Sequence, residues 1–176
     1  MHCLLKKSFY LNISFTLLAL LLLSGCGFHL KHNDGLVDKY PQIFLQSSDP
    51  NGELARLIKL RLRGSGIKIA ASPAADIATL KVESERRSSR TISLYVNAQN
   101  AEQELSYNLA YSIASPDYQM QSFSVNLYRD FLENSAQALA KSREAELLTQ
   151  ELRVIAADHI IATMLSLENK KAMSNK

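Results

Sequence analysis

An apolar run near the amino terminus constrains this chain more than any other stretch. Residues 18–30 read LALLLLSGCGFHL, and Lys6 and Lys7 precede them without any acidic residue. A basic start, an apolar run of about 7–15 residues and small residues at its end are typical of a secretory signal. The uninterrupted apolar part, 15–23 with one threonine, is shorter than the roughly 20 residues of a membrane-spanning helix, which makes a membrane anchor the weaker interpretation. We therefore expect an exported protein with residues 1–25 removed.

The four residues at the expected cleavage point, Leu23-Ser24-Gly25-Cys26, resemble the lipobox of bacterial lipoproteins. This resemblance implies a diacylglyceryl group on the sulfur of Cys26, cleavage just before it and acylation of the new amino terminus. The alternative is an ordinary secretory signal followed by a cysteine that is there by chance. Two or more acyl chains anchor a protein stably, whereas a single chain binds only marginally. An acylated Cys26 would therefore be a permanent tether.

The charge and cysteine content of the mature chain narrow its function. Removal of 25 of the 176 residues would leave 151, enough for one domain with a single core. Two of the 20 basic residues are removed with the signal. The mature chain would then have 18 basic and 17 acidic residues, and its net charge would be about +1. This balance does not indicate a nucleic-acid-binding face. Cys26 would be the only cysteine left, which excludes an intramolecular disulfide.

The first half of the domain is expected to hold a strand and a helix. The apolar run 41–47 predicts a strand. A helix is expected over 53–63, with Asp49 as its cap and a glycine, Gly64 or Gly66, at its end.

Alternating apolar and polar side chains dominate the middle of the chain. One face of each such segment is apolar and the other polar, which predicts an antiparallel sheet with one wet face. Turn-forming residues at 97–100 and 115–117 predict hairpins. The alternating segments are 80–82, 92–96, 105–113 and 123–127.

A long helix is expected from Asn134 or Ser135 to Leu167, about 50 Å in length. Its apolar positions fall into two stripes, although a helix needs only one to lie on a sheet. Either the first helix or a loop covers the second stripe, or part of this face meets another protein. The stripes are Ala136, Ala140, Leu147, Val154 and Ile161, and Leu148, Leu152, Ile155 and Ala162.

Basic side chains are the candidates for a binding site, because the sequence contains no nucleophile elbow, P-loop, zinc-protease helix or clustered metal ligands. Arg86, Arg87 and Arg90 fall between two strand segments and are expected to project from a hairpin tip. Lys141 and Arg143 fall in the first turns of the long helix. Guanidinium groups bind phosphates bidentately, so an anionic lipid headgroup is the functional alternative to a solvated basic loop.

Several stretches, in order, resemble the LptE family of lipopolysaccharide (LPS)-assembly lipoproteins. The similarity runs from the lipobox to about Leu167, and Gly27 also resembles the sorting signal of lipoproteins sent to the outer membrane. The stretches are Cys26-Gly27-Phe28-His29-Leu30, Ser48-Asp49-Pro50-Asn51-Gly52 before the basic helix, Tyr128-Arg129-Asp130-Phe131, and Ala138-Leu139-Ala140-Lys141.

The resemblance implies an α+β two-layer sandwich, with two helices packed on one face of a mostly antiparallel sheet of about four strands. The domain would span 41–168, between an acylated tether at 26–40 and a polar tail at 169–176. The implied function is that of a non-enzymatic outer-membrane lipoprotein, with no cofactor beyond the lipid on Cys26. Such a protein plugs the lumen of the LptD β-barrel, assists its assembly and binds LPS on its way to the outer leaflet, while its acyl chains lie in the periplasmic leaflet.

The same resemblance implies roles for individual residues in binding LPS. Lys141 falls on the family's basic position in the Ala-Leu-Ala-Lys motif, so it is the first candidate for contact with lipid A phosphates, at an expected exposed helix position. Val96, expected within a strand, stands where some relatives carry a basic residue. Arg90, Arg87 or Arg86 are candidates to compensate, and Arg143 adds a further one. The alternative function is that of an independent periplasmic-facing lipid-binding or hydrolytic lipoprotein.

Overall fold

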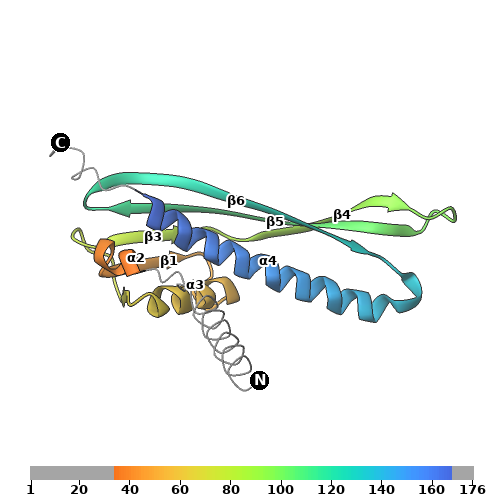
Figure 1. Ribbon diagram of the computed structural model, residues 1–176, viewed down its shortest axis with the longest axis horizontal. Helices are drawn as coiled ribbons and strands as arrows, with labels where there is room; N and C mark the ends of the chain where they lie inside the picture. Colours follow the sequence, from red (N-terminus) through yellow and green to blue (C-terminus); the bar gives the residue numbers. More distant parts are fainter. Residues whose placement is uncertain (1–33, 168–176) are drawn as a thin grey trace, which may run out of the picture. The chain divides into compact units, whose positions relative to one another are not determined.

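The computed structural model describes residues 34–167, which form a mixed six-stranded sheet with helices on one face (Figure 1). The predicted signal 1–25, the acylation site Cys26 and the polar tail 169–176 lie outside the described residues. The elements, in chain order, are α2 (Asp34–Lys39), β1 (Gln42–Ser47), α3 (Glu53–Gly64), β2 (Lys68–Ala70), β3 (Ala78–Val82), β4 (Arg86–Leu94), β5 (Asn100–Ser115), β6 (Tyr118–Leu132), η1 (Ser135–Gln137) and α4 (Ala138–Ser166).

The sheet is antiparallel around β5 and parallel around β1. Strand β1 pairs in parallel with β2 and with β3, because α3 carries the chain back to start β2 at the same end as β1. Strand β5 pairs antiparallel with β3, β4 and β6. The resemblance implied about four strands, and the sheet has six, of which β2 with three residues is the shortest.

Strands β3 and β4 share one edge of β5, and β6 occupies the other edge. The ladder continues from Val82↔Tyr111 through the bond from Glu83 N to Ala110 O (3.0 Å) to Arg86↔Asn108. Four steps along β3 and β4 here oppose three along β5, which is the pattern of a β-bulge. The segment between β3 and β4 is therefore a bulge in one edge and not a hairpin turn.

One hydrophobic core lies between the sheet and the helices, which confirms the two-layer α+β arrangement with α3 and α4 on one face. Both helices contribute apolar side chains with almost no exposed surface to this cluster, each worth about 1.5–3 kcal/mol when fully buried. Its members include Ile58 and Leu62 of α3, Ala156, Ile160 and Met164 of α4, and Ile43, Leu80, Tyr107 and Ile113 of the sheet.

Residues 34–40 belong to this core, so the predicted tether was wrong for them. They form α2 and bury Leu36 and Tyr40, which are 0% and 1% exposed. The Tyr40 hydroxyl lies 2.6 Å from that of Tyr118 and donates to the carbonyl of Met164 (3.3 Å). A six-residue helix is too short to show a helical period, which is why the sequence pattern did not reveal it.

The ends of the two long helices partly follow the expected signals. Gly52, and not Asp49, is the N-cap of α3, and Gly66 follows the helix with φ of +81°, a conformation that favours glycine. The side chain of Asn134 accepts from the amide of Ala136 (3.0 Å) and caps η1, which leads into α4. With 29 residues α4 is about 43 Å long.

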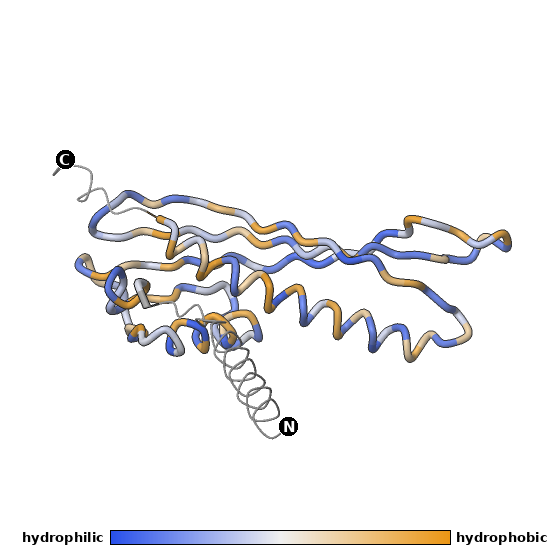
Figure 2. The backbone as a smooth tube through the Cα atoms, viewed as in Figure 1, coloured by the Kyte–Doolittle hydropathy of each residue, from blue (hydrophilic) through white to orange (hydrophobic). Residues whose placement is uncertain are grey.

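Only the second half of α4 contributes fully buried side chains to the core. Its buried residues all lie between Leu152 and Met164, whereas Leu139 and Leu147 in the first half are 69% and 61% exposed. Figure 2 shows hydrophobic positions along both halves. Neither predicted stripe is therefore buried throughout, because the core ends before the helix does. Among residues 34–167, no helix combines the length and the apolar character needed to cross a membrane.

Candidate functional site

Exposed apolar side chains gather in the elements that extend beyond the core. Each of these seven large apolar residues is at least 42% exposed, so the described residues leave much of its surface uncovered. We call them the distal apolar residues: Ile92, Leu94, Tyr95, Val96, Leu132, Leu139 and Leu147. The sequence pattern placed 92–96 on the buried face of a strand, and this was wrong because β4 continues past the point where the helices cover the sheet.

The tip of the β4–β5 hairpin lies next to the start of α4. Val96 is in the turn and not in a strand, closed by the bond from Tyr95 N to Gln99 O (2.8 Å). Ser135 of η1 donates to the side chain of Gln99 (3.4 Å), and the amide of Glu133 donates to Ala101 O (2.9 Å). These bonds hold the two ends of the distal region together.

The three arginines of β4 do not project from a hairpin tip, which corrects the sequence prediction. Because side chains alternate along a strand, Arg86 and Arg90 face away from the helices, whereas Arg87 faces them beside Tyr107. Arg90 forms an ion pair with Glu104 (2.7 Å), and Arg87 lies 3.9 Å from Glu85. Arg86 has no ion-pair partner within residues 34–167.

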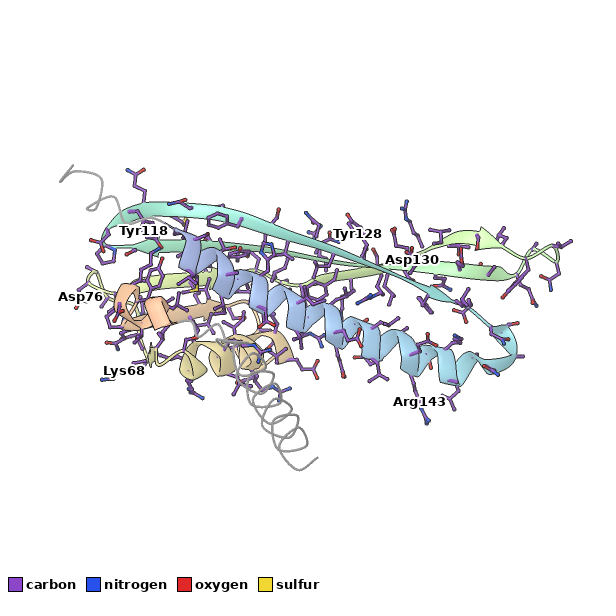
Figure 3. All side chains as sticks on the ribbon, viewed as in Figure 1. Lys68, Asp76, Tyr118, Tyr128, Asp130 and Arg143 are labelled. Carbon is purple, nitrogen blue, oxygen red and sulfur yellow. The ribbon has the colours of Figure 1, made fainter. Side chains whose placement is uncertain are left out.

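The two basic candidates in α4 differ in exposure. The Lys141 side chain is only 17% exposed and its Nζ binds Glu144 at 2.8 Å, so the expectation of an exposed position was wrong. Arg143 is exposed and makes no ion pair with any described residue (Figure 3). The helix α4 packs on the face of the sheet opposite to Arg86 and Arg90. The structure therefore does not bring the five basic candidates into one cluster.

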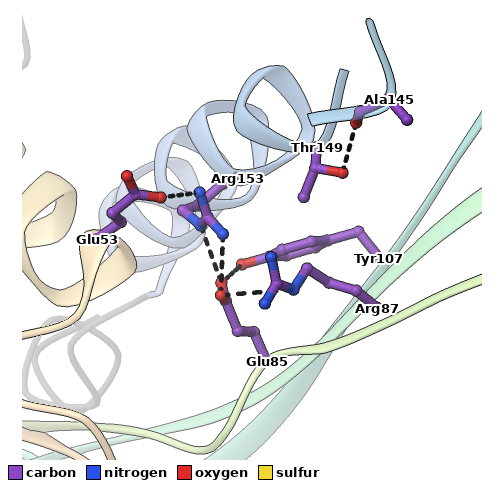
Figure 4. A network of polar contacts seen from close by, with 7 residues as sticks. All are labelled: Glu53, Glu85, Arg87, Tyr107, Ala145, Thr149 and Arg153. Carbon is purple, nitrogen blue, oxygen red and sulfur yellow. Dashed lines mark hydrogen bonds and ion pairs between the residues drawn. The ribbon is translucent and has the colours of Figure 1, made fainter. Parts of the chain in front are cut away.

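A buried polar network joins both helices to the bulge of the sheet (Figure 4). Arg153 of α4 is 3% exposed and donates twice to Glu85, at 3.0 Å each, and once to Glu53 of α3. The Tyr107 hydroxyl donates to Glu85 as well (2.7 Å). The sequence pattern did not predict this network. Arg153 precedes Ala157 and Ile161 at intervals of four residues, and this position on an apolar face is a signal that could have revealed a buried cation.

The network sets the protonation of its members. Burial alone would raise the pKa of Glu85, but the hydrogen bonds from Arg153 and Tyr107 and the charge of Arg153 outweigh it and lower that pKa. Burial, and then the bond to Glu85, raises the pKa of Tyr107, whereas the bond to Glu85 raises that of Arg153. Each group is thus held in one protonation state, which suits a structural cluster and not proton transfer.

Two hollows among the described residues are further candidate sites. One of about 340 Å³ lies between α3 and α4 and is lined in part by Leu57, Leu60 and Val154. The other, of about 480 Å³, lies at the bulge around Arg86. In the part of the chain that the structure describes, no group of histidine, cysteine, aspartate and glutamate side chains could hold a metal ion.

Comparisons with known proteins point to one family. The profile of the family described as "LptE: Lipopolysaccharide-assembly" matches residues 40–164. LPS-assembly lipoproteins LptE of Yersinia pestis and Yersinia pseudotuberculosis are 35% identical to the chain over 150 residues, which is 85% of this chain and 72% of theirs. A crystal structure of rare lipoprotein B from Shewanella oneidensis is 41% identical with a TM-score of 0.68, over 71% of this chain and 94% of that one. An uncharacterized lipoprotein B from Nitrosomonas europaea, 20% identical with a TM-score of 0.58 over 77% of this chain and 88% of that one, shares the fold.

Proposed function

Because this chain belongs to the LptE lipopolysaccharide-assembly family, we propose that it plugs an LptD β-barrel, helps that barrel to assemble and binds LPS during its insertion into the outer leaflet. Members of the family are non-enzymatic lipoproteins without a cofactor, and so is this chain. It acts in LPS assembly at the outer membrane. The finer steps, namely lipidation of Cys26 and a position inside the barrel with the acyl chains in the periplasmic leaflet, are part of the proposal.

The distal apolar residues are the observation that supports a protein partner. Large exposed apolar groups are unfavourable in water unless a partner covers them, and monomeric proteins rarely expose large contiguous patches. Val96 is fully exposed at the hairpin tip, and Leu139 and Leu147 are more than half exposed along the first half of α4. A surrounding barrel wall would cover the hairpin tip and the helix together.

A matched pair of substitutions tests this surface. We expect Leu147→Glu in the full chain to reduce the amount of LptD barrel that co-purifies from detergent-extracted membranes, because it places a charge in the interface. Leu60→Glu is the control, since Leu60 lies on α3 away from the distal region and is 60% exposed against 61% for Leu147. Recovery of the barrel with both variants at the wild-type level would contradict the proposed surface, and recovery of no barrel with the wild-type chain would contradict the proposed function.

The candidates for LPS binding are the basic residues Lys141, Arg143, Arg86, Arg87 and Arg90, with Lys141 first. We expect Lys141→Asp to weaken binding of LPS micelles to the purified full chain. The fold should persist, because a second acidic residue three positions from Glu144 costs only about 0.2–0.5 kcal/mol. Lys59→Asp on α3 is the control, and binding equal to wild type in both variants would remove Lys141 from the site.

Attachment at Cys26 is tested separately. Cys26→Ala should abolish incorporation of radiolabelled palmitate and release the chain from the membrane fraction. Labelling of the variant at the wild-type level would contradict lipidation at this position.

A further inference from the structure

The hollow at the β-bulge lies on the face of the sheet that carries no helix. Alternation along β5 and β6 turns Tyr107, Leu109 and Val125 toward the core, and therefore turns Asn108 and Asn126 to the opposite face. Its volume of about 480 Å³ falls in the range of small-molecule sites. The hollow is lined by Glu83, Ser84, Arg86, Asn108, Ala110, Ser124 and Asn126, with Leu109 between them.

Most of the polar side chains that line this hollow are unpaired, whereas the polar side chains in the neighbouring rows of the same face are paired. In the neighbouring rows of the same face, Ser88 bonds to Ser106 (2.7 Å) and Arg90 to Glu104 (2.7 Å). Within residues 34–167, five lining side chains make no side-chain hydrogen bond or ion pair: those of Ser84, Arg86, Asn108, Ser124 and Asn126. Their donors and acceptors are therefore open to a ligand.

The charge balance of the hollow favours an anion with hydroxyl groups. The carboxylate of Glu83 is paired with Lys81 Nζ at 2.8 Å, which leaves the guanidinium of Arg86 as the uncompensated charge. Arginine binds phosphate or carboxylate bidentately. Serine hydroxyls and asparagine amides both donate and accept, as neighbouring sugar hydroxyls require.

An exposed aromatic ring lies on the same face of the sheet as the hollow. Tyr128 is 59% exposed, lies opposite Ser106 in the register and shares the face of Asn126 two residues away, about 7 Å along β6. Figure 3 shows it on β6, in the layer away from Arg143 of α4. An aromatic face of this kind can pack against the apolar face of a sugar ring.

We propose that the hollow formed by Arg86, Asn108, Ser124 and Asn126 binds a phosphorylated or carboxylated sugar. We take the saccharide part of LPS as the source of this sugar, and in this respect the inference rests on the proposed function. The site is distinct from Lys141 and Arg143, which belong to α4 on the other face of the sheet. The hollow would bind the saccharide of LPS, while Lys141 and Arg143 of α4 would contact other anionic groups of the same molecule.

Calorimetric titration of the full chain in detergent with glucose 1-phosphate, glucose and inorganic phosphate tests the chemistry. We expect glucose 1-phosphate to bind more tightly than either of the others. Arg86→Met and Asn126→Asp should each weaken that binding about tenfold or more, since each alters a charge-assisted contact. Both positions are exposed, so the fold should persist in both variants, and Arg63→Met, at an exposed arginine of α3, should bind like wild type. Equal binding by wild type and Arg86→Met, or phosphate binding as tightly as the sugar phosphate, would overturn the site.

A second titration identifies the source and separates the two proposals. Lipid-free oligosaccharide released from LPS should bind the wild-type chain and lose about tenfold in affinity with Arg86→Met. LPS micelles that bind wild type and Arg86→Met equally, with no binding of either sugar ligand, would overturn this inference and leave the proposed function standing. Binding of glucose 1-phosphate through Arg86 without any binding of LPS or its oligosaccharide would support the site and contradict LPS as its source.

Discussion

Arg153→Met should destabilise the protein by about 2–3 kcal/mol. The substitution keeps most of the buried aliphatic stem and removes the guanidinium that serves both Glu85 and Glu53. Breaking a fully buried ion pair costs about 3–5 kcal/mol, because one charge is left without a partner. The side chains of Glu85 and Glu53 are 25% and 46% exposed, so water recovers part of that cost. The expected loss for Arg153→Met, about 2–3 kcal/mol, is therefore smaller than the cost of breaking a fully buried pair.

Urea denaturation followed by circular dichroism measures the effect. For a slope of about 1–3 kcal/mol per M, the midpoint should fall by about 0.7–3 M with the slope unchanged. Arg143→Met removes an exposed arginine of the same helix and should change the free energy of unfolding by less than about 0.5 kcal/mol. In the double variant Arg153→Met with Glu85→Gln, the two losses should fall short of additivity by about 1 kcal/mol or more.

Two results would refute this reasoning. A midpoint for Arg153→Met equal to that of wild type would mean that the guanidinium contributes no net stability. Strict additivity in the double variant would mean that Arg153 does not act through Glu85.

Three further predictions concern other parts of the fold. The folded pKa of Glu85 lies below its ordinary value of 4.5. The ionised Glu85 side chain therefore stabilises the fold fully above pH 4.5, and this stabilisation is lost as the pH falls through the folded pKa. Glu85→Gln should flatten the acid limb of a plot of unfolding free energy against pH. Gly66→Ala should lower the free energy of unfolding by about 1–2 kcal/mol in urea denaturation, because φ at this position is +81°. Gly64→Ala, at the last position of α3, should raise it by up to about 1 kcal/mol. An unchanged midpoint for Gly66→Ala would count against the strained conformation. Tyr118→Phe should lower the thermal midpoint by removing the 2.6 Å bond to buried Tyr40, at a cost of about 1–2 kcal/mol, and a midpoint like that of wild type would show that this bond adds nothing.

The sequence predicted those parts of the fold in which periodicity and local signals agree. The alternation of Tyr107, Leu109, Tyr111 and Ile113 predicted the buried face of β5, and the pair Gly64 or Gly66 predicted the end of α3. The pattern failed for 92–96, because alternation shows that a strand has an apolar face and not that the fold covers it. Short elements such as α2 and β2 carry too few residues to show any period.

The candidate site was less predictable, because it depends on pairing that a single chain segment does not encode. The positions of Arg86 and Arg87 on opposite faces follow from the register with β5, and the sequence suggested a hairpin tip instead. The partner of Lys141 lies only three residues away, yet the helical pattern does not show that its side chain is only 17% exposed. Glu85, Arg153 and Glu53 are far apart in sequence, and only the bulge and the two helices bring them together.

The half-packed α4 has a consequence for the free energy of binding. An isolated helical segment is only marginally stable in water when it is shorter than about 12–15 residues, and one with few tertiary contacts gains little further stability. The part of α4 before Leu152 has 14 residues and none that is buried, so its amides should exchange hydrogen faster than those of the second half. A partner that covers Leu139 and Leu147 would then spend part of its binding energy on ordering this segment. Slowed amide exchange in the first half of α4 on complex formation would report that coupling.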